Sequence, residues 1–221
     1  MLSSWLFTEI GICFLSFILV ILIVFIGYLL VTKAFKEMGF TSGEAFMLVF
    51  ASFIFGFSIF DIYLFTYNDW DIGLNIGGAL IPILLSIYLT IKKKISLLKI
   101  AIGTMGVTIV TYLVTFPDPQ EGIVSPFPLW LLPAVVAGFI SAVISHKNYR
   151  KAVPLAYISG VLGVLIGADA LHLWKFLSYP ASGIETAVVG GASVFDMIFI
   201  TGILAVIVDG LLMIGQRRKE K

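Results

Sequence analysis

Long apolar runs dominate this sequence and limit what the chain can fold into. Several of them approach the roughly 20 apolar residues that an α-helix needs to cross a bilayer. The 221 residues are 60% hydrophobic and 12% charged, whereas soluble domains are roughly 45–50% apolar. We predict an all-α polytopic membrane protein, a single integral domain over residues 1–221. Its seven transmembrane helices are expected at about 10–32, 44–66, 76–91, 99–116, 128–145, 153–174 and 187–214.

The alternation of charge between the connecting segments predicts a direction for the bundle. Thirteen of the fourteen Lys and Arg residues fall in alternate connections and at the C-terminal end, and Lys175 is the exception. The opposite connections carry acidic residues instead. Because cationic loops stay in the cytoplasm, we predict an outer N-terminus and a cytoplasmic C-terminus in a multi-pass protein of the cell membrane. All four tryptophans fall near the outer boundary, as in an interfacial aromatic belt.

Several functional classes have no support in the composition. A net charge of +1 gives no sign of nucleic-acid binding, and the single Cys13 excludes an internal disulfide. The sequence has no GxSxG, HExxH or phosphate-loop motif, and its two histidines lie in different regions. We therefore predict neither a metal site nor a cofactor. No Lys or Arg precedes the first apolar run, so we expect no cleaved signal peptide.

Two parts of the chain resemble each other. "IFDIYLF" precedes "NIGGALIPILLSIYL", and "GADALHL" precedes "VVGGASVFDMIFITGIL", which aligns Asp61 with Asp169. The same alignment pairs Gly77 and Gly78 with Gly190 and Gly191. A parallel 3+1+3 repeat, with units of about 10–91 and 128–214, would produce this pattern; chance similarity would too. Glycine-interrupted helices at matching positions mark binding sites in many transporters, but small residues also serve close helix packing.

The aspartates inside the apolar runs are the main candidates for a site, because a charge facing lipid costs several kcal/mol. Asp169 is expected about 8 Å below the outer end of helix 153–174, and Asp196 about 13 Å below the start of helix 187–214. Neighbouring antiparallel helices would bring these carboxyls together. Asp61, His172 and Thr201 are further candidates for lining the site. The alternative for each is a structural hydrogen bond.

A proline-rich external segment, "PDPQEGIVSPFP", either covers the outer cavity or only links two helices. It cannot be helical throughout because proline has no backbone N–H to donate.

Three motifs carry a resemblance to a family. "IGGALIPILLSIYL", "PLAYISGVLGVLIGADALHL" and "GGASVFDMIFITGILAV" resemble the prokaryotic membrane-protein family catalogued as domain of unknown function 1614. The resemblance implies a polytopic bundle and no particular activity. That family tends to have Asn at the position of Asp61.

A second, weaker resemblance is to the intramembrane aspartyl proteases of the presenilin and signal-peptide-peptidase group. "FDMIFITG" and "ALIP" are similar to elements of those proteases, but "ALIP" precedes the aspartates here, and "GAD" and "SVFD" replace their Tyr-Asp and Gly-x-Gly-Asp.

Two functions follow from these candidates. In the first, Asp169 and Asp196 form the catalytic pair of an intramembrane aspartyl protease acting on a membrane-embedded peptide. In the second, the buried aspartates and glycine-broken helices form a cation- or proton-coupled transporter of a small solute. A scaffold with purely structural aspartates is a third interpretation. The bilayer is the only other predicted partner, and the oligomeric state is left open.

Overall fold

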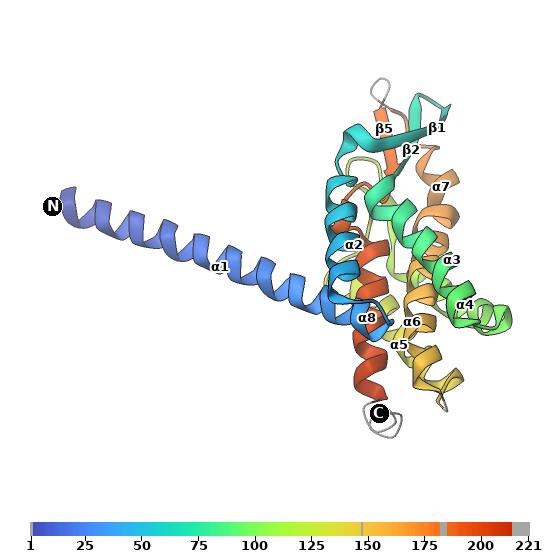
Figure 1. Cartoon of the computed structure of the whole chain (residues 1–221). Coiled ribbons are helices and arrows are strands. Elements are labelled where there is room, and N and C mark those ends of the chain that lie inside the picture. The colour runs from blue at the N-terminus through green and yellow to red at the C-terminus, as the bar shows by residue number, and fades with distance from the viewer. Residues whose placement is uncertain (1, 147, 182–184, 214–221) are drawn as a thin grey trace.

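The computed structural model describes residues 2–146, 148–181 and 185–213, and within them the chain is mostly helical (Figure 1). The helices are α1 (Leu2–Glu37), α2 (Ser42–Ile54), α3 (Ile81–Lys93), α4 (Leu97–Val114), α5 (Leu132–Ile144), α6 (Tyr149–Val164), α7 (Leu171–Phe176) and α8 (Met197–Leu212). A π-helical segment, Leu165–Ala170, joins α6 to α7, so these form one helix and the described residues contain seven. Seven helices are present as predicted, but the predicted all-α class is wrong because the described residues also form five short strands.

Four of these helices are long and apolar enough to cross a membrane. They are Ile12–Glu37, Ile76–Lys93, Leu97–Val114 and Tyr149–Phe176. The apolar helices that contain α2, α5 and α8 are shorter, between 10 and 17 residues. The protein is therefore built for a membrane environment.

The predicted helix over 44–66 is wrong beyond Ile54. The chain makes a 3₁₀ turn at Ser58–Phe60 and then a hairpin of β1 (Asp61–Tyr67) and β2 (Trp70–Asn75). Asn68 and Asp69 connect the strands with φ values of 49° and 63°. A two-residue hairpin loop needs this left-handed geometry, which Asn and Asp tolerate better than most residues. The alternating aromatic and β-branched residues of β1 favour a strand for the same segment.

The predicted helix over 187–214 begins ten residues later than expected. Residues Glu185–Val189 form strand β5, Gly190 turns the chain with a φ of 77°, and α8 begins at Met197. The predicted end at residue 214 lies outside the described residues. The run "TAVV" is rich in β-branched residues, and its pairing with β2 outweighs the helical interpretation.

A three-stranded sheet covers one end of the bundle, with the order β1-β2-β5 (Figure 1). β1 and β2 are antiparallel, whereas β2 and β5 are parallel, with Trp70 opposite Glu185 and Leu74 opposite Val189. The proline-rich segment forms a second hairpin of β3 (Phe116–Asp118) and β4 (Gly122–Val124). A 3₁₀ turn at Leu129–Leu131 then leads into α5.

Helix α6 is the centre of the core, and α3, α4, α5 and α8 pack around it. Thirteen of its sixteen residues are buried. Close approach depends on small residues: a Cβ added to Gly202 of α8 would lie 2.7 Å from Val161 Cγ2 on α6. In contrast, α1 projects away from the bundle (Figure 1) and is anchored by Ala34, Phe35 and the adjoining Met38, each about 1% exposed.

Hydrogen bonds between loops define two ends of the bundle. At one end, Lys99 Nζ donates to the Ile144 carbonyl and Lys151 Nζ to the Lys94 carbonyl, which joins the α3–α4 and α5–α6 connections. At the other end, Trp70 Nε1 donates to the Tyr179 carbonyl, and Tyr179 Oη donates to the Pro117 carbonyl. The cationic loops thus gather at one end, and the acidic hairpins and the sheet at the other. Lys147 and the C-terminal cations lie outside the described residues.

Candidate functional site

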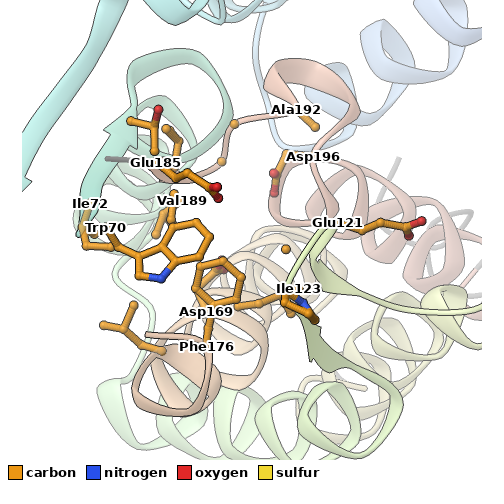
Figure 2. A pocket seen from close by; sticks show the side chains of 18 of the residues that line it. Trp70, Ile72, Glu121, Ile123, Asp169, Phe176, Glu185, Val189, Ala192 and Asp196 are labelled. Carbon is orange, nitrogen blue, oxygen red and sulfur yellow. The ribbon is translucent and has the colours of Figure 1, made fainter. Parts of the chain in front are cut away.

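A cavity of about 440 Å³ lies at the sheet end of the bundle, and both predicted aspartates line it (Figure 2). Its walls come from five places: β2, β5 with the turn that follows it, the tip of the β3–β4 hairpin, the π-helical segment with α7, and the start of α8. We call it the carboxylate cavity, after four of its lining residues: Glu121, Asp169, Glu185 and Asp196.

Asp169 reaches the cavity from the π-helical segment Leu165–Ala170. A π-bulge inserts an extra residue into a helical turn, redirects side chains and frequently occurs at functional sites. The segment packs closely on α4, since a Cβ added to Gly167 would lie 2.6 Å from the Thr108 carbonyl oxygen. The distortion thus places a carboxyl at the cavity wall within an otherwise apolar helix.

Asp196 reaches the cavity from the opposite wall, at the N-cap of α8. Its Oδ1 accepts a hydrogen bond of 2.9 Å from the Ile198 amide, and its carboxyl faces into the cavity in Figure 2. A capping aspartate satisfies an amide that has no partner within the helix. Asp196 therefore has a structural role in addition to its position at the cavity.

The two carboxyls line the same cavity from different elements. The sequence predicts that neighbouring helices bring them together, and their role as a pair stays a prediction. The element that carries Asp196 is a turn that ends in a helix cap, rather than the helix interior that was predicted.

Two further carboxylates and an aromatic wall complete the cavity. Glu185 lies on β5 and Glu121 on the β3–β4 hairpin, and none of the described lining residues is Lys, Arg or His. The rings of Trp70 and Phe176 form part of one wall, with centroids 4.7 Å apart (Figure 2). The cavity is thus lined by acidic residues and has an apolar side.

Sequence reasoning missed the contributions of Glu121, Glu185 and Trp70. The charge pattern predicts that Glu121 and Glu185 lie in outer connecting segments, and the tryptophan positions predict that Trp70 belongs to an interfacial belt. The recognisable signal was the strand propensity of "DIYLFTYNDWDIGLN" and "ETAVV", since pairing of these segments brings Trp70 and Glu185 to the cavity.

The hairpin tip is held by Asp118, whose Oδ1 accepts hydrogen bonds from the Gln120 and Glu121 amides at 2.8 and 2.9 Å. These amides lower the pKa of the Asp118 carboxyl. Because residues 119–123 line the cavity, the proline-rich segment forms a wall of the site.

The two glycine pairs have different positions. Gly190 and Gly191 line the cavity, whereas Gly77 and Gly78 lie behind it in the π-helical segment Ile76–Leu80 that leads into α3. The pairs are in contact: a Cβ added to Gly190 would lie 2.6 Å from the Ala79 amide nitrogen. The glycines therefore serve close packing that fixes the turn between β5 and α8.

Asp61 does not line the cavity. It lies on β1, where its Oδ1 accepts a hydrogen bond of 2.6 Å from Asn75 Nδ2. The predicted placement of Asp61 in a helix is wrong, and it lies on a strand whereas Asp169 lies in a π-helical segment. The segments aligned as a repeat therefore differ in secondary structure.

His172 and Thr201 also lie outside the cavity lining. The His172 ring stacks on Tyr112 of α4, with centroids 4.6 Å apart, and is 6% exposed. Thr201 is buried where α8 crosses α6, and a Cβ added to Gly160 would lie 3.2 Å from its carbonyl oxygen. Among the described residues, no group of three or more His, Cys, Asp or Glu side chains is arranged to hold a metal ion.

Comparison with known proteins gives one match. The family described as "Protein of unknown function (DUF1614)" matches residues 52–208, which include both hairpins, the carboxylate cavity and the helices around α6. No curated protein and no solved structure matches the chain. The resemblance to intramembrane aspartyl proteases has no support in these comparisons. Since the match covers well over half of the sequence, the chain belongs to the DUF1614 family.

Proposed function

We propose that the chain is an intramembrane aspartyl-type protease of the cell membrane, with Asp169 and Asp196 as its catalytic pair. The observation that carries the proposal is that both carboxyls line one cavity. Asp169 lies in the π-helical segment and Asp196 at the N-cap of α8, so the two carboxyls reach the cavity from different elements.

The chemistry needs one carboxyl ionised and the other protonated, facing the peptide bond from two sides. The ionised carboxylate removes a proton from a water molecule, whose oxygen attacks the carbonyl carbon of a peptide bond. The protonated partner donates its proton to the carbonyl oxygen. In the collapse of the tetrahedral intermediate the C–N bond breaks as one carboxyl gives its proton to the leaving nitrogen. The other carboxylate takes a proton from a hydroxyl of the intermediate, so one ionised and one protonated carboxyl remain. No other reactant is required.

The sheet supplies a means of holding the peptide. β5 is an edge strand of the sheet, and residues 185–192 line the cavity. The exposed edge of a strand offers main-chain N–H and C=O groups to an extended peptide. A substrate helix that unwinds beside β5 would place a peptide bond between the two aspartates.

The test is cleavage of a transmembrane peptide by the purified chain in lipid nanodiscs. Asp169→Asn and Asp196→Asn should each lower the rate at least about 100-fold, because each removes a general acid or base. Asn also caps helices well, so Asp196→Asn keeps the start of α8 intact. Asp69→Asn is the matched control, because Asp69 lies in the β1–β2 turn outside the cavity lining and Asn also tolerates its φ of 63°. Equal rates for wild type and both variants would contradict the proposal.

A second function is favoured by one observation: four acidic residues line the cavity, and none of the described lining residues is Lys, Arg or His. Such a lining suits a cation, and cation- or proton-coupled uptake of a small solute would use it. Asp61 does not take part, so the coupling would depend on Asp169 and Asp196 together. The protease is preferred because Asp61, which the transporter hypothesis places with the other buried aspartates, does not line the cavity.

Proteoliposome flux separates the two functions. A transporter should move a cationic solute or dissipate an imposed cation gradient, and Asp169→Asn combined with Asp196→Asn should abolish that flux without any peptide cleavage in the wild type. Cleavage without flux supports the protease, and flux without cleavage supports the transporter.

A further inference from the structure

A second carboxyl site lies inside the bundle, away from the carboxylate cavity. Asp209, on α8, is 0% exposed, so an ionisable side chain lies inside the core. Neither of its carboxyl oxygens has a hydrogen-bond partner among the described residues. Leaving an ionised carboxylate buried without a donor or a cation is among the costliest arrangements in a protein. Its environment must therefore be completed by something positive.

The neighbour of Asp209 limits what can complete it. The side chain beside the Asp209 carboxyl is Ser141 of α5. The Ser141 hydroxyl donates its hydrogen to the Ala152 carbonyl of α6. A hydroxyl has one hydrogen to donate and two lone pairs that accept. This single hydrogen has two acceptors beside it, the Ala152 carbonyl and the Asp209 carboxylate, and it cannot satisfy both.

Within the part of the chain that the structure describes, the nearby ionisable side chains do not hydrogen-bond the Asp209 carboxyl. Tyr149 of α6 packs against Gly210, because a Cβ added to Gly210 would lie 3.9 Å from the Tyr149 hydroxyl oxygen. The Tyr149 hydroxyl donates a hydrogen bond of 2.6 Å to Glu37 Oε2 of α1. Lys99 of α4 bonds the Ile144 carbonyl and Ser145 Oγ. The Tyr157 hydroxyl of α6 is buried and has no partner among the described residues.

From this arrangement we infer that Asp209 and Ser141 bind one positive charge between α5 and α8. The charge is a proton or a small monovalent metal cation such as Na⁺, because either would complete the buried oxygens of Asp209, which compete with the Ala152 carbonyl for one hydroxyl hydrogen. Helices α5, α6 and α8, which surround the site, are also the helices that hold the core together. Occupancy of the site should therefore stabilise the whole bundle. The inference does not depend on the proposed protease activity.

Thermal unfolding of the purified chain in nanodiscs tests the inference, with equimolar NaCl, KCl or choline chloride over a range of pH. A bound cation adds stability in proportion to ln(1 + [L]/Kd), so a tenfold excess over Kd should raise Tm by roughly 3–6 °C. Asp209→Asn, which carries its own amide hydrogens and no charge, should lose this response. Ser141→Ala should weaken it and is the milder variant if Asp209→Asn does not fold.

The control is Thr104→Val on α4. This variant removes a buried hydroxyl that has no hydrogen-bond partner among the described residues, and it should keep the wild-type response. Stabilisation by Na⁺ but not by choline identifies a metal cation. A response to pH alone, lost in Asp209→Asn together with an infrared carboxylic-acid band, identifies a proton. Identical responses of wild type and Asp209→Asn to every salt and pH would overturn the inference.

Discussion

Asn75 is the single residue that connects the most parts of the sheet end. Its side chain is 1% exposed, donates to the Gly56 carbonyl and to Asp61 Oδ1, and accepts from the Gly78 amide at 2.8 Å. Asn75→Ala leaves these buried groups without partners, so we predict a loss of about 2–4 kcal/mol in the free energy of unfolding. Denaturant unfolding of the purified chain measures it. Asn75→Ala combined with Asp61→Ala should lose less than the sum of the single variants, and simple additivity would contradict the network.

Asp118 is the residue whose titration should be visible at the cavity wall. Because the backbone amides of Gln120 and Glu121 lower its pKa, its contribution to the hairpin is present above the unfolded value, roughly 3.9 for Asp. This contribution is lost as the pH falls through the folded pKa. We predict that hydrogen exchange of residues 116–124, corrected for the intrinsic rate, accelerates at acidic pH. In Asp118→Ala the segment should exchange fast at every pH, and the same acid-dependent change in that variant would contradict the assignment.

At the scale of elements, the turn between β5 and α8 determines where Asp196 lies. Gly190 combines a φ of 77° with close contact to Ala79, so Gly190→Ala meets both backbone strain and a clash. We predict a loss of roughly 2–4 kcal/mol in stability, together with lower activity of the proposed Asp196 site. Gly122→Ala is matched, because Gly122 has a φ of 85° in open space and should cost only about 1 kcal/mol. Equal losses of unfolding free energy in the two variants would show that packing against Ala79 contributes nothing.

The elements that the sequence predicts best are those whose apolar runs have no competing pattern. Helices α4 and α5 agree with the predicted ranges to within four residues at each end. The strands were missed because "DIYLFTY" and "TAVV" continue an apolar run, and hydropathy does not distinguish a strand from a helix. The turn residues Asn68 and Asp69 are the signal that separates them.

At the scale of the whole molecule, the sequence predicts the helices well. It predicts the contacts between distant residues less well. Asp169 and Asp196 share a cavity as expected, whereas Asp61 does not, because its partner Asn75 holds it on the sheet. Glu185 and Trp70 reach the cavity through a parallel pairing between strands that are 115 residues apart, Trp70 opposite Glu185. Local patterns carry no information about a pairing of that length.

The direction of the whole bundle in the membrane stays a prediction, and its physical basis is the separation of charge between the two ends. Cytoplasmic loops retain Lys and Arg, so the end with Lys94, Lys99 and Lys151 should face the cytoplasm and the carboxylate cavity the outside. Cys13 is the only cysteine, which makes Cys13→Ser a clean background for labelling. An impermeant maleimide should label Gln120→Cys in intact cells, and His146→Cys only after permeabilisation. Both positions are exposed loop residues, so reactivity reports the side of the membrane and not burial. The reverse pattern would place the cavity in the cytoplasm, and substrates would then have to enter from that side.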